Sequence, residues 1–291
     1  AISERLAAYY KDLLSAANDL YLKGGESILA GLALFDREEA NILAGQSWAA
    51  KSMGIDLSSA KICMNFPDSG VYVLDLRIHP RQKIAWLENG LEAARELKDR
   101  TMEGVHLGNL GLACAALGEP RKAIEYYEQD LDIAREIGDQ RMEGNQLGNL
   151  GNAYYLLGET REAIEFYEQA LAIDREIGDR RGEGADLGNL GVAYKNLGKP
   201  RKAIKFHEQA LAIAREIGDR RNEGNQLGNL GNAYKNLGKP RKAIEFYEQA
   251  LAIAREIGDR RGEAIAFFNS SLAFFELGKN SETIEKAEIA L

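Results

Sequence analysis

The chain has 291 residues, of which 45% are hydrophobic and 28% charged, which is typical of a folded globular protein and not of a disordered one. Its formal net charge of -8 gives no overall attraction to nucleic acid, and no run of eighteen apolar residues predicts a membrane-spanning helix. Two cysteines, Cys63 and Cys114, are too few for a disulfide scaffold or a structural zinc site. We therefore expect a cytoplasmic protein that binds neither nucleic acid nor membranes.

Residues 1–79 form the first segment, and their pattern is helical. The opening AISERLAAYYKDLL is amphipathic and lacks the order of a signal peptide. One interpretation of this segment is a set of degenerate repeats. The chain starts without Met and stops at IEKAEIAL in mid-helix, so we expect it to be a fragment of a longer protein.

The rest of the chain repeats with a period of 40 residues. Residues 181–220 and 221–260 differ at only six positions, and the same frame recurs in 141–180 and 101–140. The four full copies thus span 101–260, with a half copy in front (80–100) and a partial copy behind (261–291). A period of this length predicts a solenoid of stacked units that cannot bury their apolar faces alone.

Each copy reads as a helical hairpin, because apolar residues fall twice at helical spacing. In the second copy the first helix carries Leu147, Leu150, Tyr154 and Leu157, and the second carries Ala163, Ile164, Tyr167, Ala170, Leu171 and Ile173.

Helix ends are also marked in the sequence. Gly158 and Gly178 are placed to end the two helices of the second copy, and Asp179 to cap the next helix. Pro120, Pro200 and Pro240 stand where second helices begin, a position that tolerates a missing N–H.

These residues carry a family resemblance. The series Leu147, Leu150, Gly151, Tyr154, Ala163 and Tyr167 resembles the tetratricopeptide pattern W-x2-L-G-x2-Y…A-x3-F, with Leu in place of Trp. The resemblance implies an all-α, right-handed α-solenoid that binds proteins or peptides. The 40-residue period resembles Pins-type spindle-orientation scaffolds, kinesin light chains and the sensor arrays of bacterial STAND-class signalling NTPases. Residues 1–79 resemble the helical segment that leads into such bacterial arrays.

A stripe of asparagines is the most informative polar feature. In NQLGNLGNAYKNLG, spacings of four, three and four put Asn225, Asn229, Asn232 and Asn236 on one helix face, at a cost of about 2 kcal/mol relative to Ala. The middle Asn recurs in every copy, as Asn109, Asn149, Asn189, Asn229 and Asn269. Its neighbours vary from copy to copy.

The resemblance assigns this stripe to the concave groove of the solenoid. A carboxamide has two donor hydrogens and two acceptor lone pairs, so it can hold the backbone of an extended peptide. The predicted peptide-binding asparagines are Asn109, Asn145, Asn149, Asn152, Asn189, Asn225, Asn229, Asn232 and Asn269. The alternative is that the middle Asn bridges to an adjacent helix and satisfies backbone groups there.

Basic and aromatic residues complete the predicted site. Arg141, Arg181, Arg221 and Arg261 precede the stripe by one turn, Lys195 and Lys235 flank its far end, and Tyr155 is a candidate apolar anchor. This arrangement favours an acidic or phosphorylated peptide. Pins-like scaffolds, however, commonly carry Arg where this chain has Asn145, Ala185 and Asn225, which weakens that preference. Solvated arginines at a helix start are the alternative interpretation.

No catalytic or metal-binding pattern is present, so we expect no enzyme activity, no cofactor and no metal. His207 stands in the position of Tyr167 and predicts a packing residue, and Cys114 predicts core. His106 stands where other copies have Gln or Asp, which we interpret as a solvated position. The stretches LGKP and LGKN lack the spacing of a phosphate-binding loop. Any NTPase activity would therefore lie outside this chain.

Together these features predict a non-catalytic recognition module, with the ligand-sensing region of a bacterial STAND-type NTPase as the preferred interpretation. A free-standing scaffold for protein complexes is one alternative. A solenoid that associates with itself and has no external ligand is the other.

Overall fold

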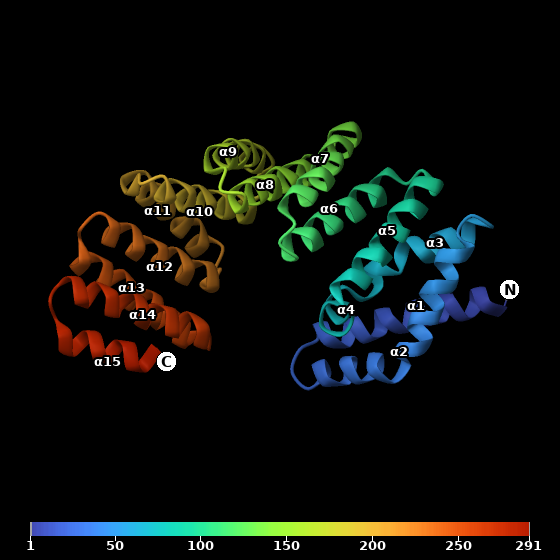
Figure 1. The fold of residues 1–291 in the computed structure, drawn as a ribbon, viewed down its shortest axis with the longest axis horizontal. Helices are drawn as coiled ribbons and strands as arrows, with labels where there is room; N and C mark the ends of the chain where they lie inside the picture. The colour runs from blue at the N-terminus through green and yellow to red at the C-terminus, as the bar shows by residue number, and fades with distance from the viewer. Residues whose placement is uncertain (1, 291) are drawn as a thin grey trace. The chain divides into compact units, whose positions relative to one another are not determined.

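The computed structural model describes residues 2–290 and contains no strand in that range, so the expected all-α repeat fold is confirmed (Figure 1). The chain divides into two compact units, Ala1–Asp139 and Gln140–Leu291. No helix of the described range is long and apolar enough to cross a membrane.

The first unit joins an N-terminal helical segment to the first repeats. Its elements are α1 (Ile2–Leu22), α2 (Ser27–Ser52), α3 (Leu57–Asn65), the 3-10 helix η1 (Pro67–Gly70), α4 (Val71–Arg77), α5 (Pro80–Leu97), α6 (Arg100–Ala116) and α7 (Pro120–Ile137). Phe35, Ile42 and Phe66 are fully buried in its core, and the ring of Phe66 meets Trp86 edge-on at 5.5 Å. The half copy, α5, therefore packs on the N-terminal segment.

The second unit is a run of helical hairpins in register with the 40-residue period. Its helices are α8 (Gln140–Leu156), α9 (Thr160–Ile177), α10 (Arg180–Asn196), α11 (Pro200–Glu216), α12 (Arg220–Asn236), α13 (Pro240–Glu256), α14 (Arg260–Glu276) and α15 (Asn280–Ala290). One apolar cluster runs from Ala163 to Ala273 across successive hairpins. Each hairpin thus buries its apolar face against its neighbours.

The helix ends follow the predicted signals. Gly158 and Gly178 take the left-handed conformation, with φ of 83° and 73°, which a residue with a Cβ adopts at a cost. The Asp179 carboxylate accepts hydrogen bonds from the N–H groups of Arg181 and Gly182, so it caps α10. Pro120, Pro200 and Pro240 begin α7, α11 and α13.

Inside each hairpin, a glycine lets the two helices approach closely. A Cβ built on Gly151 of α8 would lie 2.5 Å from Cε1 of Tyr167 on α9, and one on Gly191 would lie 2.5 Å from the imidazole of His207. These distances are far inside van der Waals contact. The tetratricopeptide-like Gly is therefore a packing requirement of this chain.

A charged network recurs between consecutive hairpins. Glu183 of α10 is buried, and it binds Arg175 of α9 and Arg180 of its own first turn. Arg180 in turn pairs with Glu216. Forty residues later the set is Arg215, Glu223, Arg220 and Glu256. The many repeated Glu and Arg residues therefore include inter-hairpin ion pairs as well as solvated charges.

Candidate peptide-binding groove

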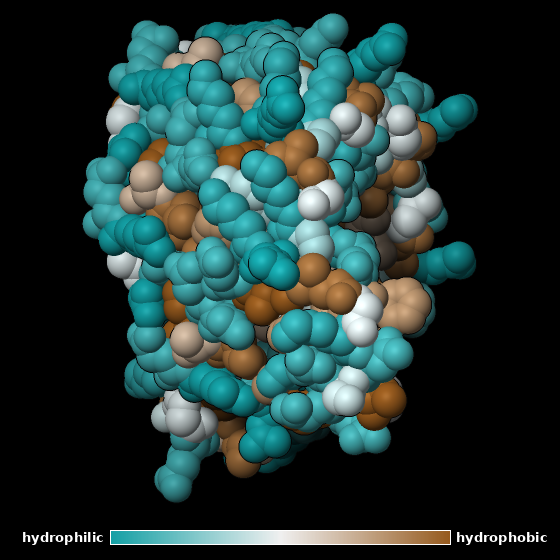
Figure 2. All heavy atoms as spheres, turned by 90° about the vertical axis from the view of Figure 1, so that its left-hand side faces the viewer, coloured by the Kyte–Doolittle hydropathy of each residue, from teal (hydrophilic) through white to brown (hydrophobic). Residues whose placement is uncertain are grey.

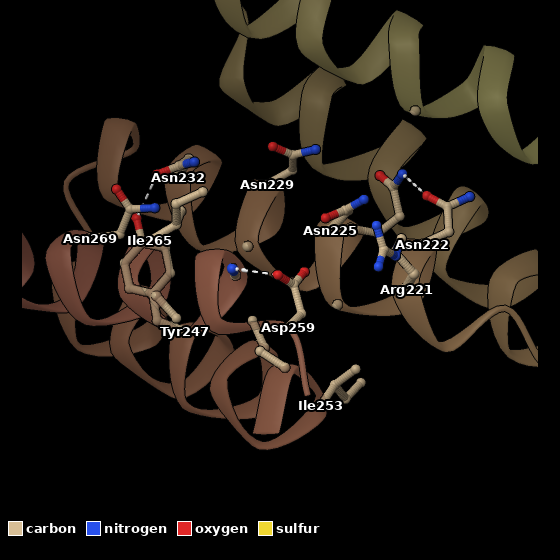
Figure 3. Close-up of a pocket in the computed structure, with 18 of the residues that line it drawn as sticks. Arg221, Asn222, Asn225, Asn229, Asn232, Tyr247, Ile253, Asp259, Ile265 and Asn269 are labelled. Carbon is tan, nitrogen blue, oxygen red and sulfur yellow. Dashed lines mark hydrogen bonds between the residues drawn. The ribbon is translucent and has the colours of Figure 1, made fainter. Parts of the chain in front are cut away.

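A cavity of ≈ 480 Å³ opens in the second unit among α10, α12, α13 and α14 (Figure 3). Amides form much of its wall. Asn225, Asn229 and Asn232 come from α12, and Asn189 and Asn269 come from the equivalent helices of the preceding and following repeats. Five of the predicted asparagines thus lie around one hollow.

The floor of this cavity is apolar. It is formed by Ala250, Ile253 and Ala254 on one face of α13 and by Ile257 directly after this helix. Tyr247 of the same helix also lines it, and its hydroxyl donates a hydrogen bond of 2.8 Å to Oδ1 of Asn232 (Figure 3). The cavity therefore offers hydrogen-bonding amides at its walls and aliphatic surface at its base, the usual composition of a ligand pocket.

The middle asparagines of the second unit are half-buried, and their described hydrogen bonds run to other side chains. Nδ2 of Asn149 donates to Oε1 of Gln146 over 3.1 Å, and Nδ2 of Asn189 lies 3.5 Å from Oδ1 of Asn152. Asn229 and Asn269 border the cavity. This geometry leaves hydrogen-bonding capacity for a ligand.

Asn152 and Asn232 have a structural partner that sequence reasoning missed. Each accepts a hydrogen bond from the tyrosine hydroxyl of its own hairpin, Tyr167 to Asn152 over 2.9 Å and Tyr247 to Asn232. The signal was present in the third copy, where the Asn and the Tyr are both replaced, by Val192 and His207. These two asparagines therefore help to hold their hairpins together.

The remaining predicted asparagines lie outside the cavity. Asn109 belongs to the first unit, where its Nδ2 is 3.5 Å from Oδ1 of Asp68 in η1. Asn145 is exposed on α8. The cavity in the second unit thus brings together only some of the asparagines that were predicted to bind a peptide.

The predicted basic residues are dispersed. Arg221 lines the cavity, but so does Asp259, and Arg141 is engaged with Asp179 at 3.6 Å. Arg181 and Arg261 are exposed and lie outside the cavity lining, as do the half-buried Lys195 and Lys235. The charge at the cavity is therefore mixed.

Tyr155, the predicted apolar anchor, also lies outside the cavity lining. It is half-buried against the apolar core of the second unit, and its hydroxyl accepts a hydrogen bond from Asn196.

The prediction that His106 occupies a solvated position is wrong. His106 is fully buried, and Gln146, Asp186 and Gln226 at the equivalent positions are buried too. We call these four residues, together with Ala266 of the last copy, the gap residues. The side chains of His106, Asp186 and Gln226 lie against a glycine of a preceding helix. An added Cβ would lie 2.9 Å from Nε2 of His106 at Gly90, 3.5 Å from Oδ1 of Asp186 at Gly148, and 2.8 Å from Nε2 of Gln226 at Gly188. Burial lowers the pKa of His106, which faces Asp68 at 4.0 Å.

The gap between α9 and α10 holds two buried carboxyl groups. Asp186 is hydrogen-bonded to Asp174, which stands where the following copies have Ala214 and Ala254. Burial, then the charge of Asp174, raises the pKa of Asp186 to about 8. Burial, then the charge of Asp179, raises the pKa of Asp174 to about 6. We assign the shared proton to Asp186, which donates it to Asp174.

His207 and Cys114 are buried, as predicted for packing and core residues. Within residues 2–290, no three His, Cys, Asp or Glu side chains gather in a way that could hold a metal ion.

Three family models of the tetratricopeptide repeat match the chain, over residues 107–141, 144–216 and 225–256. No curated protein matches it in sequence.

Among solved structures, aspartyl phosphate phosphatase F from Bacillus subtilis is similar with a TM-score of 0.73 and 15% identity, over 98% of this chain and 82% of that one. BtubC (BKLC) from P. vanneervenii is similar with a TM-score of 0.66 and 24% identity, over 73% and 90%. A STAND protein with a tetratricopeptide repeat sensor from Pyrococcus horikoshii is similar with a TM-score of 0.61 and 21% identity, over 94% of this chain but 44% of that one. At these identities the likeness is one of fold.

Proposed function

Since this chain belongs to the tetratricopeptide-repeat proteins, whose repeats bind proteins or peptides, we propose that it binds an extended peptide segment of a partner along the Asn-bearing helices of its second unit. The observation that carries the proposal is the cavity of ≈ 480 Å³ bordered by Asn189, Asn229 and Asn269. These three residues hold the same position in three consecutive repeats, so their amides meet a ligand at a regular interval.

An extended peptide is favoured by the chemistry of the wall. Each amide offers donors and acceptors that match the N–H and C=O groups of a peptide backbone. A helical ligand satisfies most of its backbone groups internally and would leave these amides without partners. At about 1 kcal/mol for each net hydrogen bond, the asparagine amides alone provide less than the roughly 8 kcal/mol that micromolar binding needs, so other contacts must contribute.

We further propose that this recognition module is the sensor region of a STAND-type signalling NTPase. The fold similarity over 94% of this chain to part of a STAND protein with a tetratricopeptide repeat sensor supports this parent. A free-standing scaffold or adaptor is the alternative. The coding sequence upstream of this segment separates them, because only the NTPase would carry a phosphate-binding loop there.

The groove is tested by changing Asn189, Asn229 and Asn269, which border the cavity, together to Ala. If the amides serve a ligand, the variant should be as stable as the parent or more stable by up to about 2 kcal/mol, since Ala is the better helix former. Its affinity for linear peptides selected from a random display library on the parent should fall by about a hundredfold or more. Thermal melts and titrations with the selected peptides measure the two effects.

A matched control removes three amides from second helices. Gln169, Gln209 and Gln249 each donate to the carbonyl four residues earlier, and none of them lines the cavity. Changing these three to Ala should leave peptide affinity unaltered. If the Asn variant instead melts far below the parent, the amides have a structural role and the groove proposal is wrong.

A further inference from the structure

The gap between α10 and α12 is filled by a side chain of the chain itself. A Cβ built on Gly188 of α10 would lie 2.8 Å from Nε2 of Gln226, the gap residue of α12. Both ends of the Gln226 amide are satisfied: Oε1 lies 2.8 Å from Nδ1 of His207, and Nε2 donates to Oδ1 of Asn222 over 2.9 Å. Gln226 therefore occupies the space beside Gly188.

The next gap, between α12 and α14, lacks that side chain. The gap residue of α14 is Ala266, and Gly262 stands where α12 has Asn222. A Cβ built on Gly228, the equivalent of Gly188, would meet no atom within 4 Å. The cavity is therefore widened here because one repeat has lost the long side chain that fills the gap in the repeat before it.

The lining of this gap suits an apolar group. Ile253 and Ala254 of the floor are buried aliphatic residues, and Ala254 stands where the carboxyl group of Asp174 lies two repeats earlier. Tyr247 replaces His207, and its hydroxyl is already bound to Asn232. A polar ligand group placed on this floor would find no partner there, which disfavours it.

One exposed apolar residue of α14 also lines the cavity. Ile265 is 50% exposed and occupies the position that Asn225 holds on α12. Figure 2 faces the C-terminal helices and shows apolar surface exposed among the polar side chains. The α14 side of the cavity therefore offers both an apolar side chain, Ile265, and an amide, Asn269.

We propose that the bound segment inserts one large apolar side chain, of the size of Leu or Phe, into the gap between Gly228 and Ala266. The amides of Asn229 and Asn269, on either side of the gap, hold the peptide groups that flank this side chain. The inserted side chain takes the place of the missing gap residue. This inference rests on the proposed function and adds the chemistry of the partner: an extended segment with an apolar anchor residue.

The test uses capped peptides of the form Gly-Ser-X-Ser-Gly, in which X is Leu, Phe, Ala or Asp. Titration is followed by the NMR shifts of the backbone amides of Gly228 and Ala266. For ligands of this size we expect a dissociation constant on the order of 1 mM with Leu or Phe, and binding about tenfold or more weaker with Ala or Asp. Ala266→Gln, which restores the gap residue of the preceding repeat, should bring the Leu peptide to the level of the Ala peptide.

Two further variants distinguish a loss of binding caused by the filled gap from one caused by a folding defect. Gly228→Leu fills the same gap from α12, and the exposed Phe268 shows that this helix position accepts a large side chain. Ala252→Gln adds the same side chain on the exposed face of α13, outside the cavity lining, and should bind like the parent. Thermal melts verify that all variants are folded.

The possible results separate the anchor from the groove. Equal affinities for X as Leu and X as Ala, or an Ala266→Gln variant that binds the Leu peptide as the parent does, would overturn the anchor. If Asn229→Ala and Asn269→Ala then weaken all four peptides alike, the groove stands without it. If no peptide binds at about 10 mM, both proposals are wrong.

Discussion

Two consecutive junctions between hairpins of the second unit, α9 with α10 and α11 with α12, have the same charged residues at their surface but different residues in their interior. Between α9 and α10, and again between α11 and α12, a buried glutamate joins two arginines, as Glu183 and Glu223 do. Inside the first junction lies the hydrogen-bonded pair Asp174 and Asp186. Inside the second, Gln226 is bound to His207.

The difference shows which parts of the repeat are fixed. The ion pairs and the glycine between the two helices of a hairpin recur in both regions, whereas the gap residue and its partner change together. The two interiors also respond differently to pH, because two adjacent buried carboxyl groups cannot both be charged cheaply, whereas a neutral His with Gln avoids the problem. Repeats with the same surface ion pairs thus differ in the electrostatics of their cores.

The largest expected effect tests what the two regions share. Gly151→Leu and Gly191→Leu should each reduce the free energy of unfolding by about 3 kcal/mol, because the new side chain would collide with Tyr167 or His207. Denaturant melts of the two variants measure the effect. Gly228→Leu is the control, since space is open at that glycine, and it should cost less than about 1 kcal/mol. Equal losses at all three positions would mean that helix propensity and not contact decides.

The next prediction concerns the difference between the interiors. Asp174→Ala with Asp186→Gln places at these two positions the residues of the second junction, while Tyr167 and Gly182 remain where Gln226 has its partners His207 and Asn222. The pKa values of about 6 and about 8 lie above the ordinary 3.8, so the folded state binds more protons than the unfolded state. The parent should therefore lose stability as the pH rises from about 4 to about 8. The variant lacks both carboxyl groups and should not show this loss. Between about pH 5 and about pH 8 the parent should therefore lose roughly 3 kcal/mol more unfolding free energy than the variant does.

Denaturant unfolding at about pH 5 and about pH 8 measures this difference. The groups that face the pair from other positions are Asp179, Glu183 and Arg141, and all three are present in parent and variant. Their contribution therefore cancels in the comparison. Parallel pH profiles for the two proteins would show that the carboxyl pair does not carry a shared proton.

Much of the fold could be predicted from the sequence because each signal was local and repeated. Helix caps such as Asp179 and helix ends such as Gly178 depend only on nearby backbone, so copy-by-copy comparison found them. The half-buried middle asparagines were placed correctly on the first helices. The family pattern singled out both Gly151 and Tyr167, and the structure shows that they are in contact across the hairpin.

The gap residues could not be read from pattern alone. His106, Asp186 and Gln226 are polar, so hydropathy places them on the surface, whereas a glycine of a preceding helix leaves room for each of them in the interior. The cavity depends on the same relation: Ala266 is an unremarkable small residue until its equivalent, Gln226, is seen to fill a space. Contacts between different helices decided both points, and the periodicity of a single helix contains no information on them.

The smallest expected effect tests whether the residues that change together are coupled. In the hairpins with Tyr167 and Tyr247, the hydroxyl is bound by Asn152 or Asn232, and in the hairpin between them these two positions hold Val192 and His207. His207→Tyr alone should cost about 1 kcal/mol, because the new hydroxyl lacks its acceptor and Gln226 loses its partner. Val192→Asn alone should be nearly neutral at this half-buried position. The double variant should recover most of the loss, giving a coupling energy of about 1 kcal/mol in a double-mutant cycle measured by denaturant unfolding. Strict additivity of the two changes would instead show that the tyrosine and asparagine of each hairpin are independent, and that their joint replacement in the third copy has no energetic cause.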